Sequence, residues 1–352
     1  MAHRLTIEPL GESIDVEDGQ SMLDAALRAG VWLPYACNHG LCGTCKVTVQ
    51  HGEIAHNHAS SFALMDVERD EGRALACCAT LESDVVIEAE VDEEPDARHL
   101  PVADHLARVT RIEALTPTIR GIHLALDGDG LGFQAGQYLN LHVPGLDAPR
   151  AFSIASPPSR GNAIELHVRR VEDGAATRWL HDSLAIGDEL RFTAPLGRFF
   201  VRRSRTTPLL FLAGGSGLSS PLAMVLNLLE GGETCPITLV HGARRRDELY
   251  RVEQLEALAA QHANFRYVAA LSDVGGDDWT GERGYVHEVA ERLYDGRFAG
   301  LSAYLCGPPP MIDACLTSLM RGRLFEEHIF AEHFFTASDA DTPRRSALFK
   351  KF

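Results

Sequence analysis

The sequence has little positive charge to balance its acidic residues. It carries 33 Lys and Arg against 49 Asp and Glu, and its formal net charge is −16. Proteins that bind nucleic acid through its phosphates need a basic surface. We therefore expect no nucleic-acid partner, whereas an acidic surface suits a basic protein partner.

The first residues also lack an apolar core flanked by basic residues, so we expect no secretory signal. One uncharged run, residues 209–229, is long enough to span a membrane. Its centre reads GGSGLSSP, which would break a spanning helix. A buried strand, a tight turn and a buried helix fit the run better. We expect a monomeric cytoplasmic protein with no membrane segment.

Residues 1–91 combine short alternating strands with one helix. Ser21 is the predicted N-cap of that helix, with Asp24 as its capping-box partner, and Gly30 is the predicted stop. The pattern indicates a small mixed sheet with one helix packed on it.

The rest of the chain changes pattern twice. Residues 92–101 are charged and bounded by proline, which predicts a linker. Many short strand-like runs in 102–204 are typical of an antiparallel barrel. Residues 205–336 alternate strands with helices, one of them over 247–261, and this is typical of a doubly wound parallel sheet. Residues 337–352 read as a polar and then basic tail.

Three of the eight cysteines fall within nine residues, in the segment CNHGLCGTC. The spacing Cys37-x4-Cys42-x2-Cys45 is that of a plant-type [2Fe–2S] cluster, whose fourth thiolate comes from farther along the chain. Gly40 and Gly43 suit a loop whose backbone approaches the cluster closely. A cluster site is therefore predicted in this loop.

Two other metal sites fit the cysteines less well. Structural zinc sites usually pair two C-x2-C elements, and only Cys42 and Cys45 form one here. A Rieske centre needs a second Cys-x2-His, which the sequence lacks. We therefore expect His39 to be a polar residue at the rim rather than a ligand.

The fourth ligand has two neighbouring candidates, Cys77 and Cys78. In a short extended segment their side chains would point to opposite faces. CNHGLCGTC with LACCATLESDVVIEAE downstream resembles the ferredoxin module of bacterial oxygenase reductases. In such modules the fourth ligand lies seven residues before an aspartate that opens the last strand. Counted back from Asp84, this resemblance implies Cys77 as the ligand and Cys78 as a packed thiol.

The segment RAFSIASPP resembles the Arg-x-Tyr/Phe-Ser signature of the ferredoxin–NADP reductase superfamily. The resemblance implies that Arg150 binds the FAD pyrophosphate, as a guanidinium fork can. Ala151 follows, and Phe152 would lie against the isoalloxazine ring. Ser153 would hydrogen-bond near flavin N5, the atom that accepts hydride.

Downstream, HVRRVEDGAATRWL continues the resemblance. His167, Val168 and Arg169 would run beside the ribityl and phosphate groups. Gly174 and Thr177 would open a helix whose N-terminal N–H groups and dipole hold the pyrophosphate.

A glycine turn, LFLAGGSGLSSP, follows a predicted strand. It is not the G-x-G-x-x-G fingerprint, but its glycines allow a pyrophosphate to approach closely. Ser220 and Pro221 are the predicted N-cap and first residue of the next helix. The residues predicted to hold the nicotinamide cofactor here are Gly214, Gly215, Ser216 and Gly217.

YLCGPPPM resembles the Cys-Gly-Pro-Pro motif that ends a strand beside the nicotinamide in this superfamily. Cys306 would then lie near C4 of the ring, followed by Gly307 and Pro308. EHFFTASD resembles the C-terminal stretch that covers the flavin, with Phe334 as candidate and Phe335 as alternative. Together with Ser153, Cys306 and Phe334 are the implied residues of the hydride-transfer site.

The choice of nicotinamide cofactor is left open between two readings. Arg244, Arg245 and Arg246 follow the second predicted strand, where an arginine can bind the 2′-phosphate of NADPH. Asp247 and Glu248 come directly after them. The family resemblance favours NADH.

Over residues 5–339 the chain resembles the reductase components of multicomponent phenol hydroxylases, which are bacterial diiron monooxygenases. The implied fold is multidomain, α+β and α/β, with a β-grasp ferredoxin, a flavin barrel and a nucleotide domain. The implied electron path runs from NADH through FAD and [2Fe–2S] to a diiron hydroxylase of aromatic, alkane or ketone substrates. The alternatives are a reductase of a ring-hydroxylating dioxygenase, a redox sensor, and a flavin reductase with a vestigial cluster.

Overall fold

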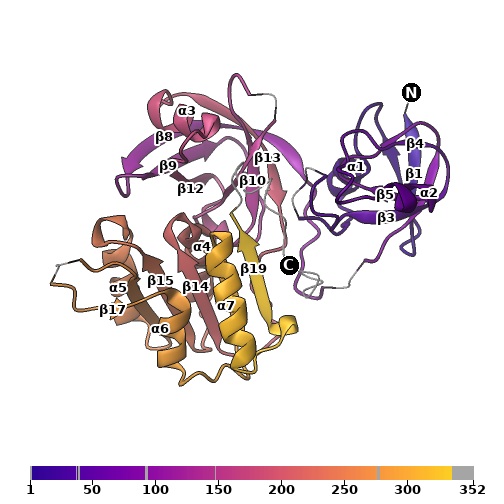
Figure 1. The fold of residues 1–352 in the computed structure, drawn as a ribbon. Coiled ribbons are helices and arrows are strands. Elements are labelled where there is room, and N and C mark those ends of the chain that lie inside the picture. Colours follow the sequence, from indigo (N-terminus) through magenta and orange to yellow (C-terminus); the bar gives the residue numbers. More distant parts are fainter. Residues whose placement is uncertain are drawn as a thin grey trace. The chain divides into compact units, whose positions relative to one another are not determined.

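The computed structural model describes residues 2–36, 38, 40–91, 94–146, 148–275 and 278–334. The chain divides into two compact units, residues 1–103 and 104–352, and each is described by itself (Figure 1). Among the described residues, no helix has the length and apolar character needed to cross a membrane.

The first unit is a five-stranded sheet in the order β2-β1-β7-β3-β5. Strand β1 pairs antiparallel with β2 and parallel with β7. Helix α1 buries its apolar side, and its N-cap Ser21 accepts a hydrogen bond from the Asp24 N–H, as predicted. The elements are β1 (His3–Glu8), β2 (Glu12–Val16), α1 (Met22–Arg28), β3 (Lys46–His51), β4 (Ile54–Ala55), α2 (Asp66–Asp70), β5 (Arg73–Leu75), β6 (Thr80–Leu81) and β7 (Val85–Glu88).

The second unit begins with a six-stranded sheet in the order β11-β10-β13-β8-β9-β12. A bridge between Ile154 and Leu166 joins its two edges, so the sheet is a nearly closed antiparallel barrel. Helix α3 follows its fifth strand. The elements are β8 (Ala103–Ala114), β9 (Ile119–Leu126), β10 (Tyr138–His142), β11 (Arg150–Ser153), β12 (Ala163–Arg169), α3 (Ala175–Asp182) and β13 (Glu189–Leu196).

The remainder is a parallel sheet in the order β17-β16-β15-β14-β18-β19. Separate apolar cores cover its two faces, with α4 and α5 in one and α6 and α7 in the other. The elements are β14 (Leu209–Gly214), α4 (Ser219–Glu230), β15 (Ile237–Ala243), α5 (Val252–Gln261), β16 (Phe265–Leu271), β17 (Glu282–Arg283), α6 (Val286–Leu293), β18 (Ser302–Gly307), α7 (Pro309–Arg321) and β19 (Ile329–His333).

The strand order creates a switch point at β14. The chain runs from β14 outward through β15 and β16, and then returns to β18 on the other side of β14. In doubly wound sheets, ligands bind outside the carboxyl ends of the strands at such a point. The predicted barrel and doubly wound sheet are thus confirmed, as is the strand, turn and helix predicted over 209–229.

Two helix starts differ from the prediction. A 3-10 turn, η2 (Gly215–Leu218), runs directly into α4 at Ser219, so Ser220 and Pro221 lie inside the helix and Ser220 is not its N-cap. The helix predicted over 247–261 begins only at Val252, because Arg251 adopts a left-handed conformation with φ of 57°. Strand β19 was not predicted at all.

Candidate functional site

Two of the predicted cluster ligands, Cys45 and Cys77, lie together in the first unit. Cys37 and its neighbour His39 lie outside the described residues. Cys45 and Cys77 are buried, whereas Cys42 is half-buried. The Sγ atoms of Cys45 and Cys77 lie 3.2 Å apart. The structure therefore brings a thiol of the loop together with the distant cysteine pair.

The expectation that Cys77 and Cys78 point to opposite faces is wrong. Both lie in a turn rather than an extended segment, and the Cys78 N–H donates to the Leu75 carbonyl at 2.9 Å. Their Sγ atoms are 3.6 Å apart. Cys78 Sγ also lies 3.5 Å from His58 Nε2. The choice of Cys77 stays a prediction, with Cys78 beside it.

The chemistry of these thiols fits an iron–sulfur cluster. Its hydrogen bond with Cys77, together with burial, raises the pKa of Cys45 well above its usual range. The bond from Cys45 lowers the pKa of Cys77, but contact with Cys78 and burial outweigh it and raise that pKa to about 12. Buried thiols of this kind ionise beside a cation, a charge that iron supplies.

The loop also approaches these thiols without intervening side chains. Gly40 has φ of 72°, and a Cβ there would lie 2.6 Å from Cys78 Sγ. Gly43 has φ of 75°, and a Cβ there would lie 3.3 Å from the Ala63 carbonyl oxygen. Both positions require glycine, for conformation and for space.

The predicted flavin signature lies on an edge strand of the barrel, β11. Arg150 is exposed, and its Nη1 donates to the Ala148 carbonyl at 2.8 Å. Ala151 is also exposed. Phe152 is half-buried against the barrel core, and Ser153 is buried. Because side chains alternate along a strand, Arg150 and Phe152 lie on one face of β11 and Ser153 lies on the other.

The second predicted flavin segment ends strand β12 and opens α3. Gly174 is the N-cap of that helix. The Thr177 hydroxyl accepts from the Val171 N–H at 3.1 Å and donates to the Gly174 carbonyl at 3.2 Å. These bonds fix the turn in which the first helical N–H groups are presented.

Strand β12 lies beside the glycine turn of the nucleotide domain. His167 and Val168 are buried, and Arg169 is exposed. An Arg169 guanidinium nitrogen lies 3.8 Å from where a Cβ on Gly215 would be. Predicted flavin and nicotinamide residues are therefore neighbours.

The ends of β14 and β18 pack closely at the switch point. A Cβ on Gly217 would lie 2.3 Å from the Cys306 carbonyl oxygen, and one on Gly307 would lie 2.7 Å from Met311 Cε. Gly214 is also crowded, since a Cβ there would lie 2.5 Å from Met311 Sδ. Ser216 of the turn is buried, and Pro308 is the N-cap of α7.

Glu332 is a functional candidate that sequence reasoning missed. It pairs with Cys306 across β18 and β19. Burial raises the pKa of Glu332 to about 7, and it raises the pKa of the Cys306 thiol well above its usual value. The sequence signal that could have revealed Glu332 is the apolar run before it in IFAEH, which is typical of a strand. Prediction of that strand, β19, would have placed Glu332 beside Cys306.

Phe334 directly follows β19. Its N–H donates to the Gly307 carbonyl at 3.1 Å, and its ring packs against the apolar core around β14. The alternative, Phe335, lies outside the described residues.

Comparisons with known proteins define the class. Three family models match in order: the 2Fe-2S iron-sulfur cluster binding domain over residues 5–82, the oxidoreductase FAD-binding domain over 106–201, and the oxidoreductase NAD-binding domain over 211–317. The chain is thus an iron–sulfur flavoprotein oxidoreductase that uses a [2Fe–2S] cluster, FAD and NADH or NADPH.

The relatives define the family more narrowly. The chain is 57% identical to the reductase component of phenol 2-monooxygenase from Pseudomonas sp. (strain CF600), over 100% of both chains. It is 52% identical to the phenol hydroxylase P5 protein of Acinetobacter pittii (strain PHEA-2), over 99% of each. The crystal structure of an Amycolatopsis cytochrome P450 reductase matches with a TM-score of 0.87 at 34% identity, covering 94% of this chain and 98% of that one.

This chain belongs to the family of phenol hydroxylase reductase components. The predicted resemblance, fold class and cofactor types are thereby confirmed.

Proposed function

We propose that this chain takes electrons from NADH and delivers them to the diiron hydroxylase of a phenol hydroxylase or a related monooxygenase. The observation that carries the proposal is the full-length identity of 57% to a phenol 2-monooxygenase reductase. When bound, FAD accepts a hydride and passes its electrons singly to a [2Fe–2S] cluster, which takes one at a time. The organic substrate is oxidised on the partner, and this chain has no need to bind it.

We assign the cofactor contacts as the sequence predicts them. Arg150, Ala151, Phe152 and Ser153 would bind FAD with His167, Val168, Arg169, Gly174 and Thr177. The turn Gly214–Gly217 and the segment Cys306–Pro308 would bind the nicotinamide cofactor, and Phe334 would cover the flavin. The cluster ligands would be Cys37, Cys42, Cys45 and Cys77.

In the hydride-transfer site each side chain has a separate task. The Ser153 hydroxyl would donate a hydrogen bond to the flavin near N5. Cys306, buried and protonated, would orient the nicotinamide ring without acting as a nucleophile. Glu332, with its pKa raised to about 7, would hold a proton beside Cys306 at neutral pH.

We propose NADH as the preferred donor. The arginine segment that could bind the 2′-phosphate of NADPH already has two acidic side chains as partners. The backbone N–H of Arg244 donates to Glu248 Oε2 at 3.1 Å, and Arg245 Nε lies 3.8 Å from Asp247 Oδ1. We expect kcat/KM to be higher for NADH than for NADPH. A preference for NADPH would assign Arg244, Arg245 and Arg246 to the 2′-phosphate.

We propose that the hydroxylase docks beside the cluster loop. Apolar side chains are exposed there: Leu41 in the loop is 51% exposed, and Phe62 is 97% exposed. The Ser60 N–H donates to the Gly40 carbonyl at 3.1 Å, which holds the Phe62 segment against the loop. Met65 and Val67 extend this exposed apolar set. Short separation between cluster and acceptor would favour electron transfer from this face.

Reconstitution tests the proposal. Purified holoprotein, NADH and the oxygenase component of a phenol hydroxylase should consume NADH and hydroxylate phenol together. NADH consumption without hydroxylation, but with normal reduction of a dye, would place the electrons with another acceptor. No dye reduction by NADH or NADPH would remove the reductase assignment and leave a sensor as the alternative.

A further inference from the structure

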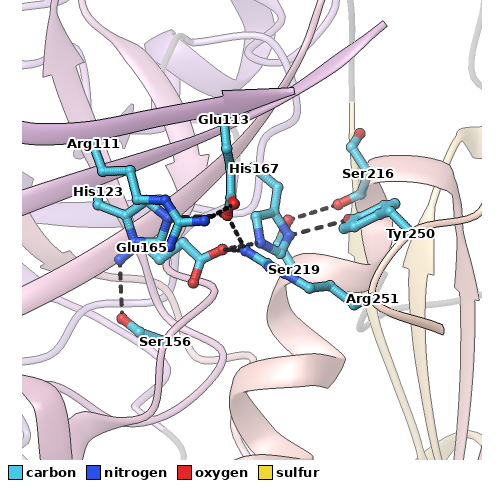
Figure 2. A network of polar contacts seen from close by, with 10 residues as sticks. All are labelled: Arg111, Glu113, His123, Ser156, Glu165, His167, Ser216, Ser219, Tyr250 and Arg251. Atoms are coloured by element: carbon cyan, nitrogen blue, oxygen red, sulfur yellow. Dashed lines mark hydrogen bonds and ion pairs between the residues drawn. The ribbon is translucent and has the colours of Figure 1, made fainter. Parts of the chain in front are cut away.

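A partly buried network of ion pairs joins the flavin barrel to the nucleotide domain (Figure 2). Arg251, which precedes α5, donates from Nη2 to Glu113 Oε1 on β8 and to Glu165 Oε1 on β12. Glu165 Oε1 also lies 2.8 Å from His167 Nε2. One guanidinium of the nucleotide domain is therefore held by carboxylates from two barrel strands.

A column of rings runs beside these ion pairs. The His167 and Tyr250 rings are 5.1 Å apart at 86°, and the Tyr250 and His241 rings are 5.5 Å apart at 86°. His167 Nδ1 lies 3.1 Å from the Tyr250 hydroxyl. All three rings are buried. The column thus continues from barrel strand β12 to nucleotide strand β15.

The carboxylates are held charged by their cationic partner. Glu113, His123 and Glu165 offer ligand atoms within 4.8 Å of one another, as a metal site would. The Arg251 guanidinium, however, already bonds both carboxylates. Burial alone would raise the pKa of Glu165, but its bond with His167 and the charge of Arg251 lower that pKa to about 2. The cation of this cluster is therefore an arginine of the other domain.

The backbone at Arg251 departs from its local preference. The sequence predicts helix through this position, yet Arg251 has φ of 57°, which is uncommon for a residue with a side chain. Conformations of this kind persist where surrounding contacts determine them, and they gather at functional sites. Here the left-handed residue delays α5 until Val252.

The network also reaches the predicted cofactor segments. His167 belongs to the segment assigned to FAD. In the nucleotide domain the Ser219 hydroxyl donates to the Ser216 carbonyl at 2.7 Å, within the glycine turn. Ser219 also hydrogen-bonds Tyr250, which lowers a tyrosine pKa that burial raises far more. Arg251 is thus linked through Tyr250 to the turn assigned to the nicotinamide cofactor.

We propose that Arg251 is a positioning residue for hydride transfer, which holds the glycine turn of the nucleotide domain against barrel strand β12. The isoalloxazine and nicotinamide rings, between which hydride passes, would then meet in a constant geometry. Arg251 would act on them indirectly, through His167 and Tyr250. This inference rests on the proposed function for its kinetic consequence, although the contact between the domains can be tested without it.

The test compares Arg251→Met with Arg251→Lys in the holoprotein. Glu113 keeps Arg111 and His123 as partners, and Glu165 keeps His167, so the methionine variant leaves neither carboxylate isolated. We expect flavin reduction at saturating NADH to slow about 10- to 100-fold in Arg251→Met, because small misplacement of reacting atoms costs rates of this order. FAD content should stay normal, and Arg251→Lys should recover part of the rate. Arg266→Met, an exposed arginine of β16, is the matched control.

Hydrogen exchange gives a second measurement that needs no turnover. In Arg251→Met, backbone amides of residues 163–169 and 215–219 should exchange faster, while those of β3 and β7 stay unchanged. Normal flavin reduction and normal exchange in Arg251→Met would overturn the inference. Faster exchange with normal flavin reduction would overturn the kinetic role. If Arg251→Met does not fold, Glu113→Gln should show the same two effects at smaller size, and a normal Glu113→Gln would count against the inference.

If NADH fails to reduce the wild-type flavin, the proposed function fails, and the exchange comparison still decides whether Arg251 holds the two domains.

Discussion

The ferredoxin unit (residues 1–103) and the flavin–nucleotide unit (residues 104–352) use charge in different ways. The first contains 19 acidic and 6 basic side chains, whereas the second contains 30 and 27. The first unit exposes Leu41 and Phe62 beside its cluster loop. The second pairs its charges in partly buried positions, as Arg251 does with Glu165. The difference suggests a division of work: one unit faces another protein, and the other uses charge to hold its own cofactor sites in place.

Loss of the cluster should show most sharply that the two units have different functions. Cys77→Ser should abolish the visible and EPR signals of the cluster and reduce electron delivery to the hydroxylase by at least about 100-fold, because iron–sulfur clusters depend on cysteine thiolates. NADH should still reduce FAD at the wild-type rate. Stopped-flow spectra measure both.

Cys78→Ser is the matched control for this prediction. It should retain the cluster and its signals. Loss of the cluster in Cys78→Ser with retention in Cys77→Ser would reverse the ligand assignment. Retention in both would show that either thiol serves, which their Sγ separation of 3.6 Å allows.

Glu332→Gln should slow flavin reduction in the second unit and leave the cluster of the first unit intact. We expect the rate of flavin reduction to fall about 10-fold at pH 7, because the proton held by Glu332 beside Cys306 would be lost. The wild-type rate should vary with a pKa near 7, and the variant should lose that dependence. Unchanged rate and pH profile would assign Glu332 to structure only.

The pH dependence of folding stability tests the raised pKa of Glu332 independently. Its folded pKa of about 7 lies above its usual value of 4.5, so its contribution to stability is full below about pH 4.5 and is lost as pH rises through 7. The melting temperature of the wild type should fall relative to Glu332→Gln between about pH 4.5 and 7, and the difference should be level at higher pH. A difference between the two that is constant over the whole range would contradict the raised pKa.

Phe62→Ser tests the exposed face of the ferredoxin unit. We expect the apparent KM for the hydroxylase to rise about 10-fold, since an aromatic at the centre of an interface often contributes this much. Reduction of a small dye should not change. Ile186→Ser, at a site 65% exposed on the barrel, is the control and should leave both unchanged. Equal effects of the two substitutions would remove the docking assignment.

Ser21→Ala should produce the smallest effect, confined to the ferredoxin unit. Its hydroxyl accepts from the Asp24 N–H at 3.2 Å, and loss of such an N-cap costs about 1 kcal/mol. Calorimetry should show a lower unfolding transition for that unit and none for the other. A shift of both transitions would mean that the units unfold together.

Local patterns in the sequence were sufficient for most of the fold. The alternation of strands and helices predicted over 205–336 is observed, because a buried parallel strand such as β16 or β18 is a short apolar run between turns. The [2Fe–2S] site could be predicted from the spacing of Cys37, Cys42 and Cys45, because the three fall within nine residues of sequence. Ser21 could be assigned because an N-cap is a local hydrogen bond.

The features that the sequence did not predict have a common physical origin, which is contact between segments distant in the chain. The left-handed Arg251 pairs with Glu113 and Glu165, which lie far earlier in the chain. Glu332 acquires its raised pKa only when β19 lies beside β18. The turn at Cys77 packs against the cluster loop, so alternation did not apply there. Local propensity cannot report such contacts.

Rapid mixing of the oxidised holoprotein with NADH under anaerobic conditions tests the central claim most directly. The account predicts that flavin absorbance bleaches first and that the EPR signal of the reduced cluster then grows. Flavin bleaching with no cluster signal, or a cluster signal that precedes flavin reduction, would contradict an electron path from NADH through FAD to [2Fe–2S].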